Sequence, residues 1–331
     1  MIPPSTIDLS LVIPLYNEEE VFGELLRRLT DFLAALQAAA VPEARNIEVI
    51  FVDDGSRDAT AALIQQACAA HSWCRGVIFS RNFGHQTAVT AGMQHSRGQS
   101  VAILDGDLQD PPEVVAEFLR KMRDGFDVVY AIRTQRKENI FKRAAYAAFY
   151  RLMRALSSIP IPLDSGDFCL MSRRVVDQIN AMPERHRFIR GMRSWVGFRQ
   201  VGHSYPRDAR RQGQSKYSFS KLLKLAFDGI FTFSEKPLRW STLLGLTVAG
   251  ASLIWGCYVI LWRLFGTHPP ELQGWATMVV GMLFLGGVQL ISIGILGEYI
   301  GRIHNEVKGR PLYVVQERFG FPEPAKKPDP A

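Results

Sequence analysis

Acidic side chains follow three short apolar segments of the chain, at the point where each segment ends. The three groups are Glu18 after residues 9–13, Asp53 and Asp54 after residues 49–52, and Asp105 and Asp107 after residues 101–104. Carboxylates gathered in one place repel one another unless a cation lies among them. Asp105 and Asp107 are separated by a single glycine, so both can reach one Mg²⁺ or Mn²⁺, cations that prefer oxygen ligands. The sequence therefore predicts a divalent-cation site here, with substrate phosphates completing the shell.

Five apolar segments of strand length alternate with four helical segments in the first 131 residues. The strands are expected at Leu9–Ile13, Val49–Val52, Val77–Phe79, Val101–Leu104 and Val128–Ala131, and the helices at Glu19–Ala40, Ala59–His71, Gln86–His95 and Glu113–Asp124. This order predicts an α/β fold, a mostly parallel sheet covered on both faces. Because ligands bind at the carboxyl ends of such strands, the acidic turns would share one edge. That shared edge favours a metal site over ordinary acidic turns, although a lone Asp-Gly-Asp would be weak support.

Composition and missing motifs exclude several classes of protein. The 331 residues are 47 % apolar and 21 % charged, unlike a disordered, collagen-like or disulfide-scaffold chain, and predict about two folding units. Neither GxGxxG nor GxxxxGK[ST] occurs, which disfavours a dinucleotide oxidoreductase and a P-loop NTPase. The four cysteines form no CxxC pair and are expected to be reduced thiols, and residues 1–10 lack the features of a cleavable signal.

Positive charge is concentrated in one stretch. The chain has a net charge of +7, yet residues 185–239 alone hold thirteen lysines and arginines against three acids. Such a local excess indicates a phosphate-rich partner or an anionic membrane surface, and no nucleic acid is expected. A solvated helix face is the ordinary alternative.

Two segments near the C-terminus are long and uncharged. Trp240–Trp262 and Trp275–Gly297 each have 23 residues without a charge, enough to span about 35 Å as helices. They are predicted to cross a membrane, with tryptophans at its interfaces. The alternative is a pair of helices buried in a soluble domain. Basic residues flank the outer ends of the pair, which predicts a multi-pass protein of the inner (cytoplasmic) membrane with catalytic domain and both termini in the cytoplasm.

These features divide the chain into four expected parts. Residues 1–217 form the α/β domain, 218–237 an amphipathic helix at the membrane interface, 238–302 the two-helix membrane domain and 303–331 a cytoplasmic tail. The helix at 218–237 could instead pack on the α/β domain. The tail is rich in proline and lysine from Gln316 on and is expected to be disordered. Gly297 and Gly301 form a GxxxG pattern, weak support for a homo-oligomer.

Motifs along nearly the whole chain carry a family resemblance. They are VIPLYNEE at 12–19, VDDGSRD at 52–58, RNFG at 81–84, DGDLQ at 105–109, GDF at 166–168, SK at 215–216, FSEKPLR at 233–239 and GEYIGR at 297–302. The sequence resembles the inverting family-2 glycosyltransferases with a GT-A (Rossmann-like) fold. Within these it is most similar to the polyprenyl-phosphate glycosyltransferases of the GtrB type, relatives of dolichol-phosphate mannose synthase. Gly106 departs from the small side chain usual there, with little effect expected on metal ligation.

The resemblance assigns residues to a nucleotide-sugar site. It places the donor nucleotide against Pro14, Tyr16, Glu18, Asp53, Asp54 and Asp105, and the metal, Mg²⁺ or Mn²⁺, on Asp105, Asp107 and Gln109. Carboxylates can accept hydrogen bonds from a base or ribose, and a tyrosine ring can cover a base. For Glu18 and Asp54, helix capping and turn formation remain as alternatives. The metal would neutralise the departing diphosphate.

The resemblance also implies the acceptor, a polyprenyl phosphate. Its phosphate would contact Arg133, Arg143, Arg207 and Lys216, and the catalytic centre would hold Asp107, Arg133 and Asp167. Any one of these cations could instead be an ordinary surface charge near a membrane. Asp167 would bind a sugar hydroxyl or orient the acceptor. Because the acceptor is already an anion, no strong general base is needed.

The expected reaction is transfer of one sugar, with glucose from UDP-glucose preferred, to undecaprenyl or another polyprenyl phosphate. The QxxRW pattern of processive synthases is absent, which favours single transfer. Two alternatives stay open: the same chemistry with formamido-aminoarabinose or mannose, and a catalytically idle membrane scaffold subunit.

Overall fold

The computed structural model describes residues 7–134, 165–206, 236–265 and 275–321. The described residues fall into two compact units. Residues 7–134, 165–206 and 310–321 form the first, and residues 236–265 and 275–309 form the second. The chain therefore leaves the first unit and returns to it after the second.

The first unit is built on one eight-stranded sheet in the order β7-β5-β6-β4-β1-β2-β3-β8. The strands are β1 (Leu9–Leu15), β2 (Ile47–Asp53), β3 (Cys74–Phe79), β4 (Ser100–Ile103), β5 (Val128–Thr134), β6 (Ser165–Ser172), β7 (Gln200–Pro206) and β8 (Val315–Phe319). The four central strands β4, β1, β2 and β3 are parallel, with Leu9 of β1 opposite both Ile47 of β2 and Ser100 of β4. Strand β6 runs antiparallel to β4 and β5, and β8 runs antiparallel to β3. The predicted mostly parallel core is confirmed.

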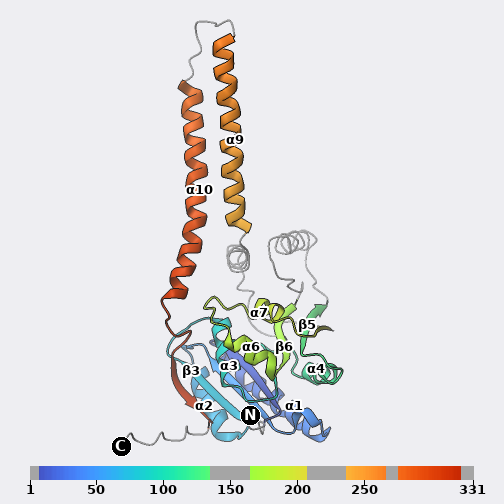
Figure 1. The fold of residues 1–331 in the computed structure, drawn as a ribbon. Coiled ribbons are helices and arrows are strands. Elements are labelled where there is room, and N and C mark those ends of the chain that lie inside the picture. Colours follow the sequence, from blue (N-terminus) through green and yellow to red (C-terminus); the bar gives the residue numbers. More distant parts are fainter. Residues whose placement is uncertain (1–6, 135–164, 207–235, 266–274, 322–331) are drawn as a thin grey trace, which may run out of the picture. The chain divides into compact units, whose positions relative to one another are not determined.

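Helices cover both faces of the sheet (Figure 1). They are α1 (Glu19–Ala38), α2 (Thr60–Ala70), α3 (His85–His95), α4 (Val114–Arg123), α6 (Arg173–Ala181) and α7 (Ile189–Trp195). On one face α1, α2 and α4 pack on alternate residues of the strands, such as Leu11 and Ile13. On the other face α3, α6 and α7 pack against intervening residues such as Val12. This two-sided burial explains why the central strands read as continuous apolar runs.

The second unit consists of helices α9 (Lys236–Phe265) and α10 (Trp275–Val307). Leu238–Tyr258 and Met278–Val307 are long and apolar enough to cross a membrane, and neither span is buried inside the structure. Large apolar side chains such as Leu253 and Leu283 are exposed. Helices of a soluble core would bury these side chains, so the described residues do not support that alternative. Helix α10 continues ten residues beyond the predicted end at Gly297.

One expectation about the C-terminus is wrong. The tail was predicted to be disordered from Gln316 on, but Val315–Phe319 forms strand β8 at the edge of the sheet. The prediction rested on the prolines and lysines of residues 322–331. The segment before them instead pairs with β3. The predicted interfacial helix at 218–237 lies outside the described residues, apart from the first two residues of α9.

Candidate active site

The loops after β1 and β2 are joined by hydrogen bonds. The Asn17 amide donates to Ser56 Oγ at 2.9 Å, and Asn17 Oδ1 accepts from the Arg57 amide at 2.8 Å. The Glu18 amide donates to Thr60 Oγ1 at 3.0 Å. Because these bonds fix both turns, the exposed ring of Tyr16 is held at the edge of the sheet where nucleotide binding was predicted.

Two of the residues predicted to contact the donor nucleotide, Pro14 and Glu18, are not fully exposed on the surface. Pro14 is buried within β1, opposite Val52 of β2. Glu18 immediately precedes α1, and its side chain makes no capping hydrogen bond. The capping alternative for Glu18 is therefore not what the structure shows.

Asp54 is an anchor for the loop after β3. Its side chain is 3 % exposed, and its carboxylate accepts hydrogen bonds from Asn82 Nδ2 at 2.9 Å and from the amides of Phe83 and Gly84 at 2.6 and 2.9 Å. Burial raises the pKa of Asp54, and these amide donors act in the opposite direction without cancelling it. The carboxylate is thus engaged in holding residues 82–84.

The turn after β2 needs its glycine. Gly55 has φ +67°, and a Cβ there would lie 2.2 Å from the carbonyl carbon of Arg81. Next to it, Asp53 accepts a hydrogen bond from the Ser56 amide at 3.1 Å and another from the Ser56 hydroxyl. Burial raises the pKa of Asp53. The turn at 53–56 is therefore packed directly on the loop that Asp54 holds.

Asp105 and Asp107 lie at the end of β4, next to the end of β1. A Cβ on Gly106 would lie 2.3 Å from Leu15 Cδ2, so the glycine permits close packing between these turns. Asp107 Oδ1 accepts the Gln109 amide at 3.2 Å. Burial and the negative charges of Asp110, Asp167 and Asp107 raise the pKa of Asp105 to about 6, although His85 opposes this.

These residues fit a divalent cation of the Mg²⁺ or Mn²⁺ type. The donors are carboxylate and amide oxygens, and Asp105 is a buried acid whose pKa is raised first by burial and then by neighbouring carboxylates, whose charge a cation would neutralise. Within the described residues, no three His, Cys, Asp or Glu side chains already stand together as a metal cage. A cation bound by Asp105, Asp107 and the Gln109 side chain would draw its remaining ligands from substrate phosphate or water.

Asp167, at the start of β6, is surrounded by hydrogen-bond donors. Arg190 Nε lies 2.8 Å from Asp167 Oδ1, while His85 Nε2 and Gln86 Nε2 lie 3.3 and 2.9 Å from Oδ2. Burial alone would raise the pKa of Asp167, but Arg190 and His85 outweigh it and hold this pKa well below its usual range. Asp167 is therefore an ionised carboxylate held between the guanidinium of Arg190 and the imidazole of His85.

His85 joins Asp167 to the predicted metal residues. Its Nε2 lies 3.8 Å from Asp105 Oδ1, and it is the first residue of α3. Burial lowers the pKa of His85, but the hydrogen bond with Asp167 and the charges of Asp105 and Asp167 prevail and raise it. Arg190 and the imidazole of His85 therefore lie beside the carboxylates of Asp105 and Asp167. A site that binds both anionic substrates and a cation needs groups of both kinds.

Three residues of this cluster, His85, Gln86 and Arg190, were not predicted from the sequence. His85 directly follows the RNFG motif, and Arg190 lies in the basic stretch, so both carried a signal. Nothing in the sequence paired them with Asp167.

Of the four basic residues predicted to bind the acceptor phosphate, the structure describes one. Arg133 lies in β5, opposite Tyr205 of β7. Arg143, Arg207 and Lys216 lie outside the described residues.

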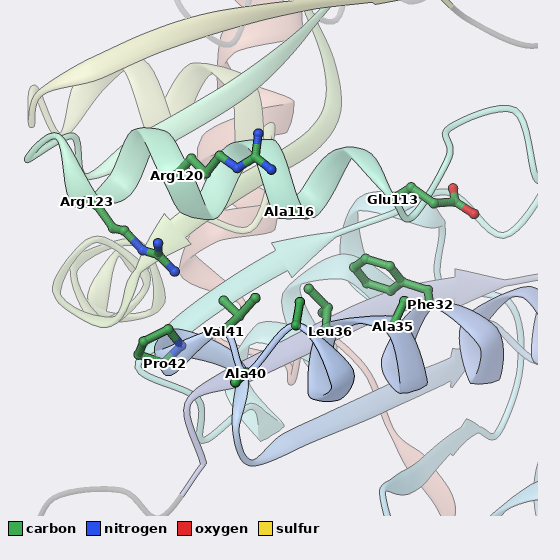
Figure 2. A pocket seen from close by; sticks show the side chains of 11 residues that line it. Phe32, Ala35, Leu36, Ala40, Val41, Pro42, Glu113, Ala116, Arg120 and Arg123 are labelled. Atoms are coloured by element: carbon green, nitrogen blue, oxygen red, sulfur yellow. The ribbon is translucent and has the colours of Figure 1, made fainter.

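A cavity of about 410 Å³ lies elsewhere, between α1 and α4 (Figure 2). Its lining includes Phe32, Leu36, Arg120 and Arg123 but none of the predicted site residues. The two arginines are paired with Glu117 and Glu43. The cavity thus adds nothing to the acidic site at the strand ends.

The class of protein follows from comparison with known families, and it agrees with a mostly parallel sheet that carries acidic turns at its strand ends. Residues 10–179 match glycosyl transferase family 2, so the chain belongs to this family of enzymes. Residues 236–303 match the GtrB C-terminal hairpin, which covers both apolar helices and supports membrane association.

Curated relatives match over almost their full length. The chain is 42 % identical to YkcC of Bacillus subtilis, described as an uncharacterised glycosyltransferase, over 95 % of each chain. It is 40 % identical to the bactoprenol glucosyl transferase of Shigella phage SfII, over 93 % of this chain and 97 % of the relative. Both units of the chain are therefore present in these relatives.

Solved structures show weaker similarity. The mannosyltransferase PcManGT of Pyrobaculum calidifontis, in complex with GDP-Man and Mn²⁺, aligns with 93 % of this chain and 89 % of its own at 14 % identity and a TM-score of 0.40. Glucosyl-3-phosphoglycerate synthase of Mycobacterium tuberculosis aligns with 68 % of this chain and 78 % of its own at 18 % identity and a TM-score of 0.44.

Proposed function

We propose that this protein transfers a single glucose from UDP-glucose to a polyprenyl phosphate, with inversion at the anomeric carbon. The observation that carries the proposal is the 40 % identity to a bactoprenol glucosyl transferase, which extends over the catalytic unit and the apolar hairpin together. A lipid acceptor stays in the bilayer, so a transferase that uses it needs to be held at the membrane.

The metal would be held by Asp105, Asp107 and Gln109. A bound Mg²⁺ or Mn²⁺ supplies Lewis-acid neutralisation of the diphosphate leaving group. The hydrogen bond from the Gln109 amide to Asp107 Oδ1 and the close packing of Gly106 against Leu15 keep the turn in place. No protein acid is then needed to protonate the leaving group.

The donor nucleotide would lie along the turns after β1 and β2. Tyr16 offers an exposed ring to a base, and half-buried Glu18 offers carboxylate oxygens to base or ribose. Asp53 is buried and accepts hydrogen bonds from Ser56, so it would contribute by holding this turn. Asp54 contributes indirectly, because its oxygens hold the loop at 82–84, and buried Pro14 shapes the end of β1.

The acceptor phosphate would be bound by Arg133, Arg143, Arg207 and Lys216. Guanidinium groups suit phosphate geometry and screen the approach of two anions. Asp167 is better suited to orient groups than to act as a base, since Arg190, His85 and Gln86 already donate to it. Catalysis then consists of holding the phosphate in line with the anomeric carbon.

The membrane arrangement in this proposal has the catalytic unit and both termini in the cytoplasm. Basic residues Lys236, Arg239, Arg302, Lys308 and Arg310 flank the outer ends of the hairpin, in support of this orientation. A homo-oligomer is proposed on the GxxxG pattern of Gly297 and Gly301.

The test is transfer of radiolabelled sugar from a panel of UDP- and GDP-sugars to undecaprenyl phosphate, by the full chain in detergent. We expect butanol-extractable label from UDP-glucose only when Mg²⁺ or Mn²⁺ is present, and none from Asp107→Ala. Label from another donor would replace glucose with that sugar, and a chain that labels the lipid from no donor would overturn the polyprenyl-phosphate acceptor.

A further inference from the structure

The chain returns from the apolar hairpin to the sheet. Helix α10 ends at Val307, and six residues later Tyr313 begins a segment that closes the sheet edge. The Ser80 amide donates to the Val314 carbonyl at 3.0 Å, and β8 continues the pairing, with Ile78 opposite Glu317. The last strand of the catalytic unit is thus supplied by residues that follow the hairpin.

Tyr313 is the centre of an aromatic stack at this edge. Its ring lies on that of Phe79, with centroids 4.9 Å apart and planes 20° apart, and Phe79 meets Phe83 edge-on at 5.7 Å. The Tyr313 hydroxyl donates to Gln94 Oε1 of α3 at 2.7 Å. Tyr313 therefore contacts both the end of β3 and the helix that follows it.

Phe83 connects this stack to the acidic site. Its amide and that of Gly84 donate to the Asp54 carboxylate at 2.6 and 2.9 Å. Gly84 precedes α3, whose first residue, His85, lies against Asp105 and Asp167. A shift of Phe83 would move the partners of Asp54 and the start of α3 together.

We propose that Tyr313 is a positioning residue for the donor site: by stacking on Phe79 it fixes the loop at 82–84 and, through it, Asp54 and His85. The inference rests on the proposed function for the identity of the donor. The segment that follows the apolar hairpin then helps to hold the nucleotide-sugar site in its binding geometry.

The test compares Tyr313→Ala with Tyr313→Phe in the full chain in detergent. Loss of one aromatic stack predicts a rise of about three- to tenfold in the UDP-glucose KM and in the UDP Kd for Tyr313→Ala. The KM for polyprenyl phosphate should stay within about twofold, since no step of the argument involves that substrate. Tyr313→Phe keeps the stack and should restore both donor constants.

Two control variants separate positioning from general loss of stability. Leu36→Ala removes a buried side chain of α1 remote from the stack and should lower Tm without a donor-specific change in KM. Gln316→Ala alters an exposed residue of β8 and should behave as wild type. Hydrogen exchange supplies an independent readout: Tyr313→Ala should increase exchange at Phe83 and Gly84 but not at Gln109.

The outcomes distinguish the inference from the proposed function. If wild type transfers glucose and Tyr313→Ala leaves the UDP Kd unchanged, or raises the KM values of both substrates to the same extent, the positioning role is wrong. A wild-type chain that binds no UDP would overturn the donor assignment itself and this inference with it.

Discussion

Asp167 and Arg190 form an ion pair in which Arg190 Nε lies 2.8 Å from a carboxylate that is only 5 % exposed. Asp167 lies in strand β6 and Arg190 lies in helix α7, 23 residues apart in the chain. His85 and Gln86 of α3 contact the other carboxylate oxygen. One ionised side chain therefore joins three elements beside the predicted metal site.

Replacing Asp167 with Asn should destabilise the catalytic unit and reduce its activity. The change leaves Arg190 without its charge partner, and because Arg190 is partly solvated we expect a cost of about 1–3 kcal/mol in the free energy of unfolding. Thermal unfolding in detergent measures this as a fall in Tm.

The matched control for Asp167→Asn is Asp177→Asn. Asp177 pairs with Arg173 at 3.6 Å and is 55 % exposed, so its loss should cost less than about 0.5 kcal/mol. Equal Tm changes in the two variants would mean that the pair at Asp167 is not the stabilising contact described.

Replacing Asp107 with Asn should reduce kcat by about a hundredfold or more, because a carboxylate ligand to the cation is lost. The Mn²⁺ concentration needed for half-maximal activity should rise. Glu117→Gln, an exposed change on α4, is the control and should leave both quantities unaltered. Activity of Asp107→Asn with the same metal dependence as wild type would contradict the metal assignment.

Metal binding should weaken as the pH falls through about 6. The pKa of Asp105 is raised to about 6 in the protein without metal, chiefly by burial, and a carboxylate binds a cation in its deprotonated form. Protons therefore compete below that pH, and the apparent affinity should fall by about tenfold for each further unit. Titration with Mn²⁺ from pH 5 to 8, followed by electron paramagnetic resonance, measures this.

The pH profile has its own control. The side chain that Asp105→Asn introduces does not titrate in this pH range. This variant should bind Mn²⁺ more weakly, and its affinity should no longer change with pH near 6. An unchanged profile in that variant would assign the titration to another group.

Replacing Asp54 with Ala should lower stability, because the amides of Phe83 and Gly84 lose a buried acceptor. Each unsatisfied buried group costs about 1–3 kcal/mol. Asp54→Asn keeps one carbonyl oxygen and should cost less. Denaturant unfolding of the two variants checks the order, and a more stable Asp54→Ala chain would show that the loop does not depend on this anchor.

The central strands and the predicted metal residues were accessible from the sequence because local patterns encode them. Leu9–Leu15 reads as an apolar run since both faces of β1 are buried, and Asp105 and Asp107 follow β4 directly. Strand β8 was missed because its pairing partner β3 lies some 240 residues earlier in the chain. Its sequence, with three exposed residues, gives little apolar signal.

The site likewise combines residues that local sequence patterns reveal with contacts that they do not reveal. The acidic motif containing Asp54 was visible, but its engagement with residues 82–84 depends on the close approach of two loops at Gly55. The pairing of Asp167 with Arg190 depends on the crossing of β6 and α7. Contacts of this kind arise from tertiary packing, which no short sequence pattern records.

The measurement that tests the central claim most directly is the structure of the lipid product formed from UDP-glucose and undecaprenyl phosphate. Mass spectrometry and NMR of the butanol-extracted lipid should show one hexose on the phosphate, with an anomeric configuration opposite to that of the donor. Wild type should form this product and Asp107→Ala should not. A lipid with several hexoses, a retained configuration, or no glucosylated lipid from an active preparation would contradict the account.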